Sequence, residues 1–153
     1  MVRGTLGLLA MLLFLSLGLQ VAIDQRDRLA TIEPSAKPWL QQLCEPFRCV
    51  ISPLRQLESL AIEGSSFHKM APQAYRLGFA LRNAGMLEVA APAIELTLTD
   101  AHDQALARRV LNSSELGMPA AIRAGSEWTG AVVLRLSPSV GEVAGYRILA
   151  FYP

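Results

Sequence analysis

Ile94-Glu95-Leu96-Thr97-Leu98-Thr99 is the stretch that decides the fold of this 153-residue chain. Apolar and polar residues alternate through it, which is the pattern of a β-strand with one buried face. Leu96 then points into a core, and Glu95 and Thr97 lie on the solvated face. The turn residues of Asp100-Ala101-His102-Asp103 end the strand. The stretch therefore predicts a β-sheet that covers a core on one side only.

The same period of two recurs on both sides of this stretch. Residues 75–82 and 128–136 alternate in the same way, and residues 60–62 and 106–111 are weaker candidates. Residues 146–152 are apolar on both faces, so we expect them at the centre of a sheet. One short helix is expected after Asn112, which can cap it, with Glu115 completing a capping box. Six or so short strands separated by turns indicate a mainly β fold, an antiparallel sandwich or barrel.

A very different stretch precedes the strands. Leu6 to Ile23 (LGLLAMLLFLSLGLQVAI) carries no charge, and as a helix it would span about 27 Å, close to the thickness of a bilayer's hydrocarbon core. Its apolar run is longer than that of a signal peptide, and its end shows no clear small-x-small cleavage site. We therefore expect an uncleaved transmembrane helix. Because only a short cytoplasmic leader, residues 1–5, precedes it, we expect the N-terminus inside and the C-terminal part outside.

Residues 24–56 are expected to form a helical stalk. Pro34 ends its first helix, and Pro38 begins its second. Cys44 and Cys49, the two cysteines of the chain, follow with Pro46 in the loop between them. In an oxidising compartment this pair predicts a local disulfide. Half of a zinc site, a redox-active pair and two free thiols are the less favoured alternatives. Residues 57–153 then form the β domain.

Charge and motifs exclude several classes of function. All 13 acidic residues and 13 of the 14 basic ones follow the apolar stretch, so the exported part has no net charge, and we expect no nucleic-acid binding. We find no motif for a catalytic, cofactor or metal site. We expect His68 in a loop and His102 in a turn, both exposed. We expect Arg108 and Arg109 to be an exposed pair on a strand. We expect a protein that is not an enzyme, with no catalytic residue, cofactor or metal.

Several segments, taken in order, are similar to a known family. They are Asp27-Arg28-Leu29, the region from Pro38 to Cys49, residues 57–66, Leu81-Arg82-Asn83, residues 92–100, residues 107–111, residues 145–148 and the final Phe151-Tyr152-Pro153. Together they resemble the bacterial domain-of-unknown-function family 3426 (DUF3426).

The resemblance implies an exported immunoglobulin-like β-sandwich with no assigned activity. Many members of the family begin with a cytoplasmic zinc ribbon of two C-x-x-C pairs. Here only residues 1–5 precede the apolar helix. The chain is therefore either a member without the ribbon or one whose gene start is placed too late, and no zinc role is carried over.

These observations give one expected function and two alternatives. We expect a single-pass protein of the bacterial inner membrane, held in the lipid bilayer through Leu6 to Ile23, with its C-terminal domain in the periplasm. That domain would act as a non-catalytic binding or accessory module for a membrane or periplasmic protein. The alternatives are an accessory subunit of a multi-protein membrane complex and, less favoured, an unrecognised envelope enzyme.

Overall fold

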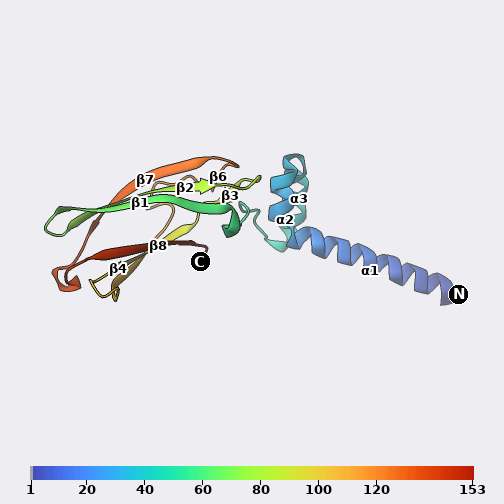
Figure 1. Ribbon diagram of the computed structural model, residues 1–153. Coiled ribbons are helices and arrows are strands. Elements are labelled where there is room, and N and C mark those ends of the chain that lie inside the picture. The colour runs from blue at the N-terminus through green and yellow to red at the C-terminus, as the bar shows by residue number, and fades with distance from the viewer. Residues whose placement is uncertain (1) are drawn as a thin grey trace. The chain divides into compact units, whose positions relative to one another are not determined.

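The computed structural model describes residues 2–153, without the side chains of residues 2–4, 34, 47 and 139. Met1 and the Arg3 side chain of the expected leader therefore lie outside the described residues. The chain forms two compact units, Met1–Leu54 and Arg55–Pro153, which are mainly helical and mainly β, respectively (Figure 1).

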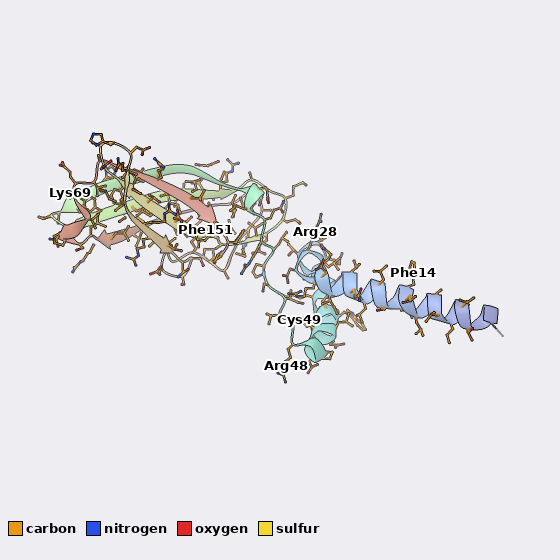
Figure 2. The ribbon with its side chains drawn as sticks, turned by 90° about the horizontal axis from the view of Figure 1, so that it is seen from below. Phe14, Arg28, Arg48, Cys49, Lys69 and Phe151 are labelled. Carbon is orange, nitrogen blue, oxygen red and sulfur yellow. A yellow bond between two sulfur atoms is a disulfide. The ribbon has the colours of Figure 1, made fainter. Side chains whose placement is uncertain are left out.

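The first unit begins with a long apolar helix. Helix α1 (Val2–Asp24) contains a stretch, Thr5–Asp24, that is long and apolar enough to cross a membrane, and no residue of it is fully buried inside the protein. Side chains such as Phe14 project outward from it (Figure 2). A soluble core helix would hide such a surface, so α1 is a candidate for a membrane anchor or a signal sequence.

Two short helices follow α1 in the first unit. Helix α2 (Arg26–Ile32) is separated from α1 by Gln25 alone, a 3-10 turn (Pro34–Ala36) follows it, and α3 (Lys37–Cys44) leads into a second 3-10 turn (Glu45–Phe47). The predicted break at Pro34 is confirmed, and Pro38 lies in the first turn of α3, where its missing N–H costs no hydrogen bond.

The second unit is built from antiparallel strands. Its elements are a 3-10 turn (Leu57–Ser59), β1 (Leu60–Ala71), β2 (Ala74–Asn83), β3 (Val89–Ala90), β4 (Ala93–Thr99), β5 (Ala105–Leu111), β6 (Ala121–Ile122), β7 (Glu127–Arg135), a 3-10 turn (Pro138–Val140) and β8 (Gly145–Phe151). One sheet has the order β1-β2-β7 and another the order β5-β4-β8, while β3 and β6 form a small ladder.

The two larger sheets share one hydrophobic core. Leu77, Phe79 and Leu81 reach it from β2, and Ile94, Leu96 and Leu98 reach it from β4. The period of two is therefore confirmed in both strands. The predicted mainly β, antiparallel fold, preceded in the sequence by an apolar helix, is confirmed as well. The likeness to an immunoglobulin domain stays a prediction.

Aromatic side chains connect the two sheets on the side of β1 and β8. The Phe67 ring lies 5.4 Å from that of Tyr146 and stacks on Tyr75 at 5.0 Å. The Tyr146 hydroxyl also shares a hydrogen bond of 3.0 Å with the hydroxyl of Ser65. These contacts tie the outer strand of one sheet to the outer strand of the other.

Two strand predictions need correction. The segment 146–152 is not central, because β4 takes that place between β5 and β8. Strand β8 lies at the edge, and Leu149 on its outer face is 60% exposed. Strand β1 continues to Ala71, so His68 lies in a strand and not in a loop. The run Gly64-Ser65-Ser66 has no apolar alternation, so the sequence pattern does not reveal that the strand continues there. Backbone pairing with β2 extends the strand through this run.

Two further predictions fail for local reasons. The expected helix after Asn112 is a series of turns, which Gly117 leaves with a φ of 69°, a conformation that does not continue a helix. Only the Glu115 half of the capping box forms, by accepting the Asn112 N–H at 3.0 Å. Thr97 is on the face opposite the core as expected but is only 8% exposed, because its neighbours across the strands are Arg108 and Arg147.

Candidate functional site: the junction between the apolar helix and the stalk

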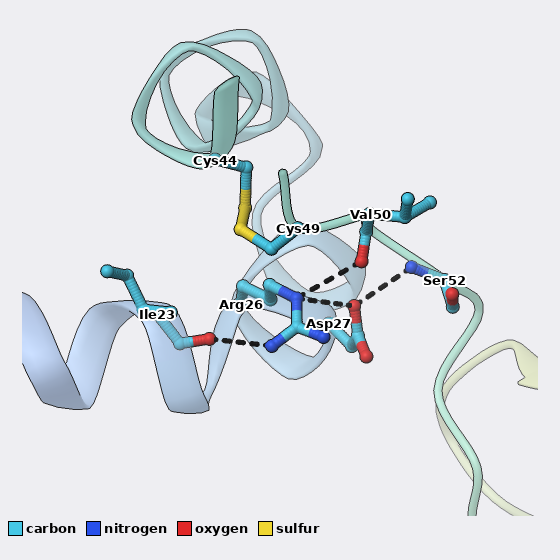
Figure 3. Close-up of a disulfide and its surroundings, with 7 residues drawn as sticks. All are labelled: Ile23, Arg26, Asp27, Cys44, Cys49, Val50 and Ser52. Atoms are coloured by element: carbon cyan, nitrogen blue, oxygen red, sulfur yellow. Dashed lines mark hydrogen bonds and ion pairs between the residues drawn. A yellow bond between two sulfur atoms is a disulfide. The ribbon is translucent and has the colours of Figure 1, made fainter. Parts of the chain in front are cut away.

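The last turn of α1 differs from the rest of the helix in its surroundings. Residues 5–21 are exposed, whereas Ala22 and Ile23 are half-buried, and α1 contacts both α2 and α3. Arg26 fastens this end of the helix. Its Nη1 donates to the Ile23 carbonyl at 3.0 Å, and its Nε donates to the Val50 carbonyl at 3.1 Å (Figure 3). The end of the apolar helix is thus part of the stalk's own structure.

Asp27 supplies the second half of this connection. Its Oδ1 accepts the backbone N–H of Ser52 at 2.9 Å and lies 3.8 Å from Arg26 Nε (Figure 3). The carboxylate also sits in the first turn of α2, where the positive end of the helix dipole stabilises a negative charge. Two adjacent side chains therefore join α1, α2 and the returning segment 50–52.

A disulfide adds a covalent bond between the end of α3 and the segment that follows it. Cys44 at the end of α3 is bonded to Cys49, with their Cα atoms 4.9 Å apart. Arg48, with a φ of 53°, turns the chain, and the Cys49 N–H donates to the Cys44 carbonyl at 3.2 Å. The predicted disulfide is thus present, and it directs the chain from α3 back to the segment that Arg26 and Asp27 hold.

An open groove of about 580 Å³, lined by both apolar and polar residues, lies beside the disulfide. Gln41, Gln42, Glu45 and Arg48 contribute its polar lining. Within the part of the chain that the structure describes, no group of three or more His, Cys, Asp and Glu side chains is placed to hold a metal ion. What the junction does show is a set of backbone carbonyls and N–H groups fixed by hydrogen bonds, and one covalent link.

The other residues that the sequence singled out are dispersed over the β domain. His68 is exposed on β1. His102 is exposed in the turn after β4, where its backbone N–H donates to Oδ1 of Asp100 at 2.8 Å. Glu95 and Arg108 form an ion pair of 3.4 Å, and Arg109 forms another with Glu115 at 3.3 Å. The structure does not bring these groups together into one site.

Sequence reasoning missed the roles of Arg26 and Asp27. Both stand directly after an uncharged run, where charged residues are common for reasons of solubility alone. Their partners are backbone groups 24 and 25 residues away, and no sequence pattern reveals such partners. A signal did exist in Cys49, because a disulfide that brings residue 49 back to α3 also brings Val50 and Ser52 near the stalk helices.

A second connection went unpredicted at the end of the β domain. The Tyr152 hydroxyl donates to the Ala90 carbonyl at 2.8 Å, and the Arg55 guanidinium lies 5.8 Å from the Tyr152 ring and donates to the Pro153 carbonyl. Burial raises the pKa of the Tyr152 phenol, although a hydrogen bond from the Gln56 backbone and the charge of Arg55 act against it. Arg55, the first residue of the β unit, thus contacts its last two residues, Tyr152 and Pro153.

Comparison with known proteins identifies the β domain. No curated protein and no solved structure matches the chain. The profile of DUF3426, described as a protein of unknown function, matches residues 57–150, which is more than half of the chain and covers all the strands but the last residue of β8. The chain therefore belongs to the DUF3426 family.

Proposed function

We propose that the chain is a single-pass protein of the bacterial inner membrane, with its N-terminus in the cytoplasm and its β domain in the periplasm. The β domain acts there as a non-catalytic module that binds, or assists, another membrane or periplasmic protein. The observation that carries the proposal is the junction, in which an exposed apolar helix is fastened to a disulfide-linked stalk.

The junction supports an anchor over a cleaved signal sequence. A signal sequence is removed from the mature protein, so a folded mature part gains nothing from bonding to it. Here the Ile23 carbonyl accepts a hydrogen bond from Arg26, and Ala22 and Ile23 are half-buried against the stalk. Cleavage near this point would remove groups that the stalk uses. The apolar helix is therefore expected to stay attached.

The disulfide supports the orientation. Disulfides persist in oxidising compartments such as the periplasm and are rare in the cytosol. Cys44 and Cys49 follow α1 in the chain, so a single span would place them and the β domain on the same side. That side is then the periplasmic one, and the N-terminus is cytoplasmic.

Paired surface charges support a binding role over a catalytic one. Catalytic groups usually converge in one cleft. On this β domain the acidic side chains Glu63, Glu95 and Glu115 instead pair with arginines on solvent-facing positions. An accessory subunit of a larger membrane complex is a special case of this proposal.

Reporter fusions test the topology. Alkaline phosphatase fused after Pro153 should be active, because that enzyme matures only outside the cytoplasm, and a green fluorescent protein exported by the same route should be dark. The protein should also stay in the membrane pellet after alkaline carbonate washing and keep its N-terminal mass. An inactive phosphatase with a bright fluorescent fusion would refute the orientation, and loss of residues before Asp24 would refute the anchor.

Purification from detergent extracts tests the binding role. The full chain should recover a stoichiometric membrane or periplasmic protein, and a version that ends at Leu54 should not recover it. If the full chain is instead a monomer that turns over a substrate, the proposal of a non-catalytic module is wrong and the envelope-enzyme alternative holds.

A further inference from the structure

Helix α3 has two apolar faces, and the protein covers only one of them. Leu40 and Cys44 are buried in the stalk. Trp39 and Leu43, also four residues apart and hence on a common face, are 72% and 42% exposed. A helix of a water-surrounded stalk would carry polar residues at such positions.

Helix α2 repeats this feature. Leu29 and Ile32, three residues apart, are both exposed, and α2 packs against α3. Two short helices thus leave four large apolar side chains uncovered. We call Leu29, Ile32, Trp39 and Leu43 the interfacial set.

We propose that the interfacial set lies in the headgroup layer of the bilayer that α1 spans, so that the stalk rests along the membrane surface. The inference depends on the proposed anchoring of α1. Helix α2 begins two residues after α1 ends, and Arg26 binds both Ile23 and Val50, so the stalk is held at the end of the span. Both stalk helices run across the direction of α1 (Figures 1 and 3). A span that crosses the bilayer therefore lays them along its surface.

The chemistry of the set fits the same place. Indole rings are enriched at membrane interfaces, where one side of the ring meets apolar chains and the N–H meets water. Short amphipathic helices bury their apolar face at the boundary between headgroups and acyl chains. Arg28 and Lys37 are exposed, and among the described residues neither forms an ion pair. Such cations can extend toward lipid phosphates.

Fluorescence of Trp39 in lipid vesicles tests this inference. The full chain with Trp128→Phe leaves Trp39 as the single tryptophan. In phosphatidylethanolamine–phosphatidylglycerol vesicles it should emit at shorter wavelength than in water. Phospholipids brominated near the headgroup end of the acyl chain should quench it several-fold more than phospholipids brominated near the chain terminus, and aqueous acrylamide should quench it weakly. Leu43→Gln should reduce the lipid quenching, whereas Val133→Gln, which changes an exposed apolar residue of the β domain, should leave it unchanged.

The outcomes separate this inference from the proposed anchor. Carbonate resistance and the N-terminal mass of the same samples report on α1 alone. If α1 is inserted but Trp39 is quenched by acrylamide and not by bromolipid, the interfacial set faces water, and the inference is overturned. A blue-shifted Trp39 without bromolipid quenching would assign the set to a second protein chain and would overturn it as well.

Discussion

At the scale of single residues, Asn83 illustrates how a polar side chain becomes part of a core. It is fully buried at the end of β2. Its Nδ2 donates to the carbonyls of Leu87 and Ile122 at 2.8 and 3.0 Å, and its Oδ1 accepts the Gly85 N–H at 2.9 Å. The sequence predicts a turn at Asn83-Ala84-Gly85, but it does not reveal the partner at Ile122, which is 39 residues away.

Replacing Asn83 by Ala should lower the free energy of unfolding by roughly 3 kcal/mol. The change leaves the buried Ile122 carbonyl and the partly buried Leu87 carbonyl and Gly85 N–H without their partners. A buried group left without its partner costs about 1–3 kcal/mol, and partly buried groups fall at the low end of that range because water reaches them. Asn112→Ala should cost less than about 0.5 kcal/mol, because that side chain is exposed. Urea unfolding of the full chain in mild detergent, followed by Trp128 fluorescence in a Trp39→Phe background, measures both. Similar midpoints for the two variants would contradict the role assigned to Asn83.

Tyr152 gives the β domain a dependence on alkaline pH. Burial raises its pKa above the ordinary value of 10.0, so the folded state holds the phenol proton more tightly than the unfolded state does. Its contribution to stability is then complete below pH 10 and falls as the pH rises through the raised pKa.

Urea midpoints between pH about 8 and about 11 should fall less steeply for Tyr152→Phe than for the unchanged protein. The Phe variant should also be less stable at the lower pH, since it loses the hydrogen bond to Ala90. Equal slopes would show that the phenol does not titrate differently in the folded protein.

At the scale of elements, the alternation of apolar and polar residues predicts which face of a strand is buried, but it does not predict the order of the strands in a sheet. It placed Leu77 and Leu96 in the core correctly, because the side-chain period of two is a property of each strand alone. It misplaced β8, since Leu149 is apolar yet exposed at an edge. Strand order depends on which segments pair over long distances, and that information is not carried by one strand's pattern.

Strand β4 allows the outer and inner faces to be compared directly. Leu96→Ala should cost about 2–5 kcal/mol, because it removes buried methyl groups and leaves a cavity. Thr97→Ala should cost about 1 kcal/mol, since the arginines of the flanking strands cover this threonine. Thr129→Ala on the exposed face of β7 should cost less than about 0.5 kcal/mol. Urea midpoints in the order Thr129→Ala, Thr97→Ala, Leu96→Ala, from highest to lowest, would agree with this burial. Equal midpoints for the two threonine variants would mean that Thr97 is not covered.

At the scale of the whole molecule, the sequence predicted the components of the junction but not how they are joined. The uncharged run, the proline-broken helices and the Cys44–Cys49 pair can each be recognised from local composition. The hydrogen bonds of Arg26 and Asp27 cannot, because they end on backbone atoms that every residue has. The interfacial set was equally hidden, since an apolar residue on a short helix is buried or exposed according to the neighbours that the fold supplies.

Because the chain forms two compact units, removing the disulfide should affect one of them only. The bond closes a short loop, for which the entropy lost by the unfolded chain corresponds to about 2 kcal/mol. In Cys44→Ser/Cys49→Ser the segment 44–52 should open more often, and trypsin should cleave after the exposed Arg48 faster than in the unchanged protein. Cleavage after Arg76, within β2, should stay slow, and the urea midpoint reported by Trp128 should not move. If the midpoint of the β domain falls with the disulfide, the two units do not fold independently, and the stalk is then part of what stabilises the domain it carries.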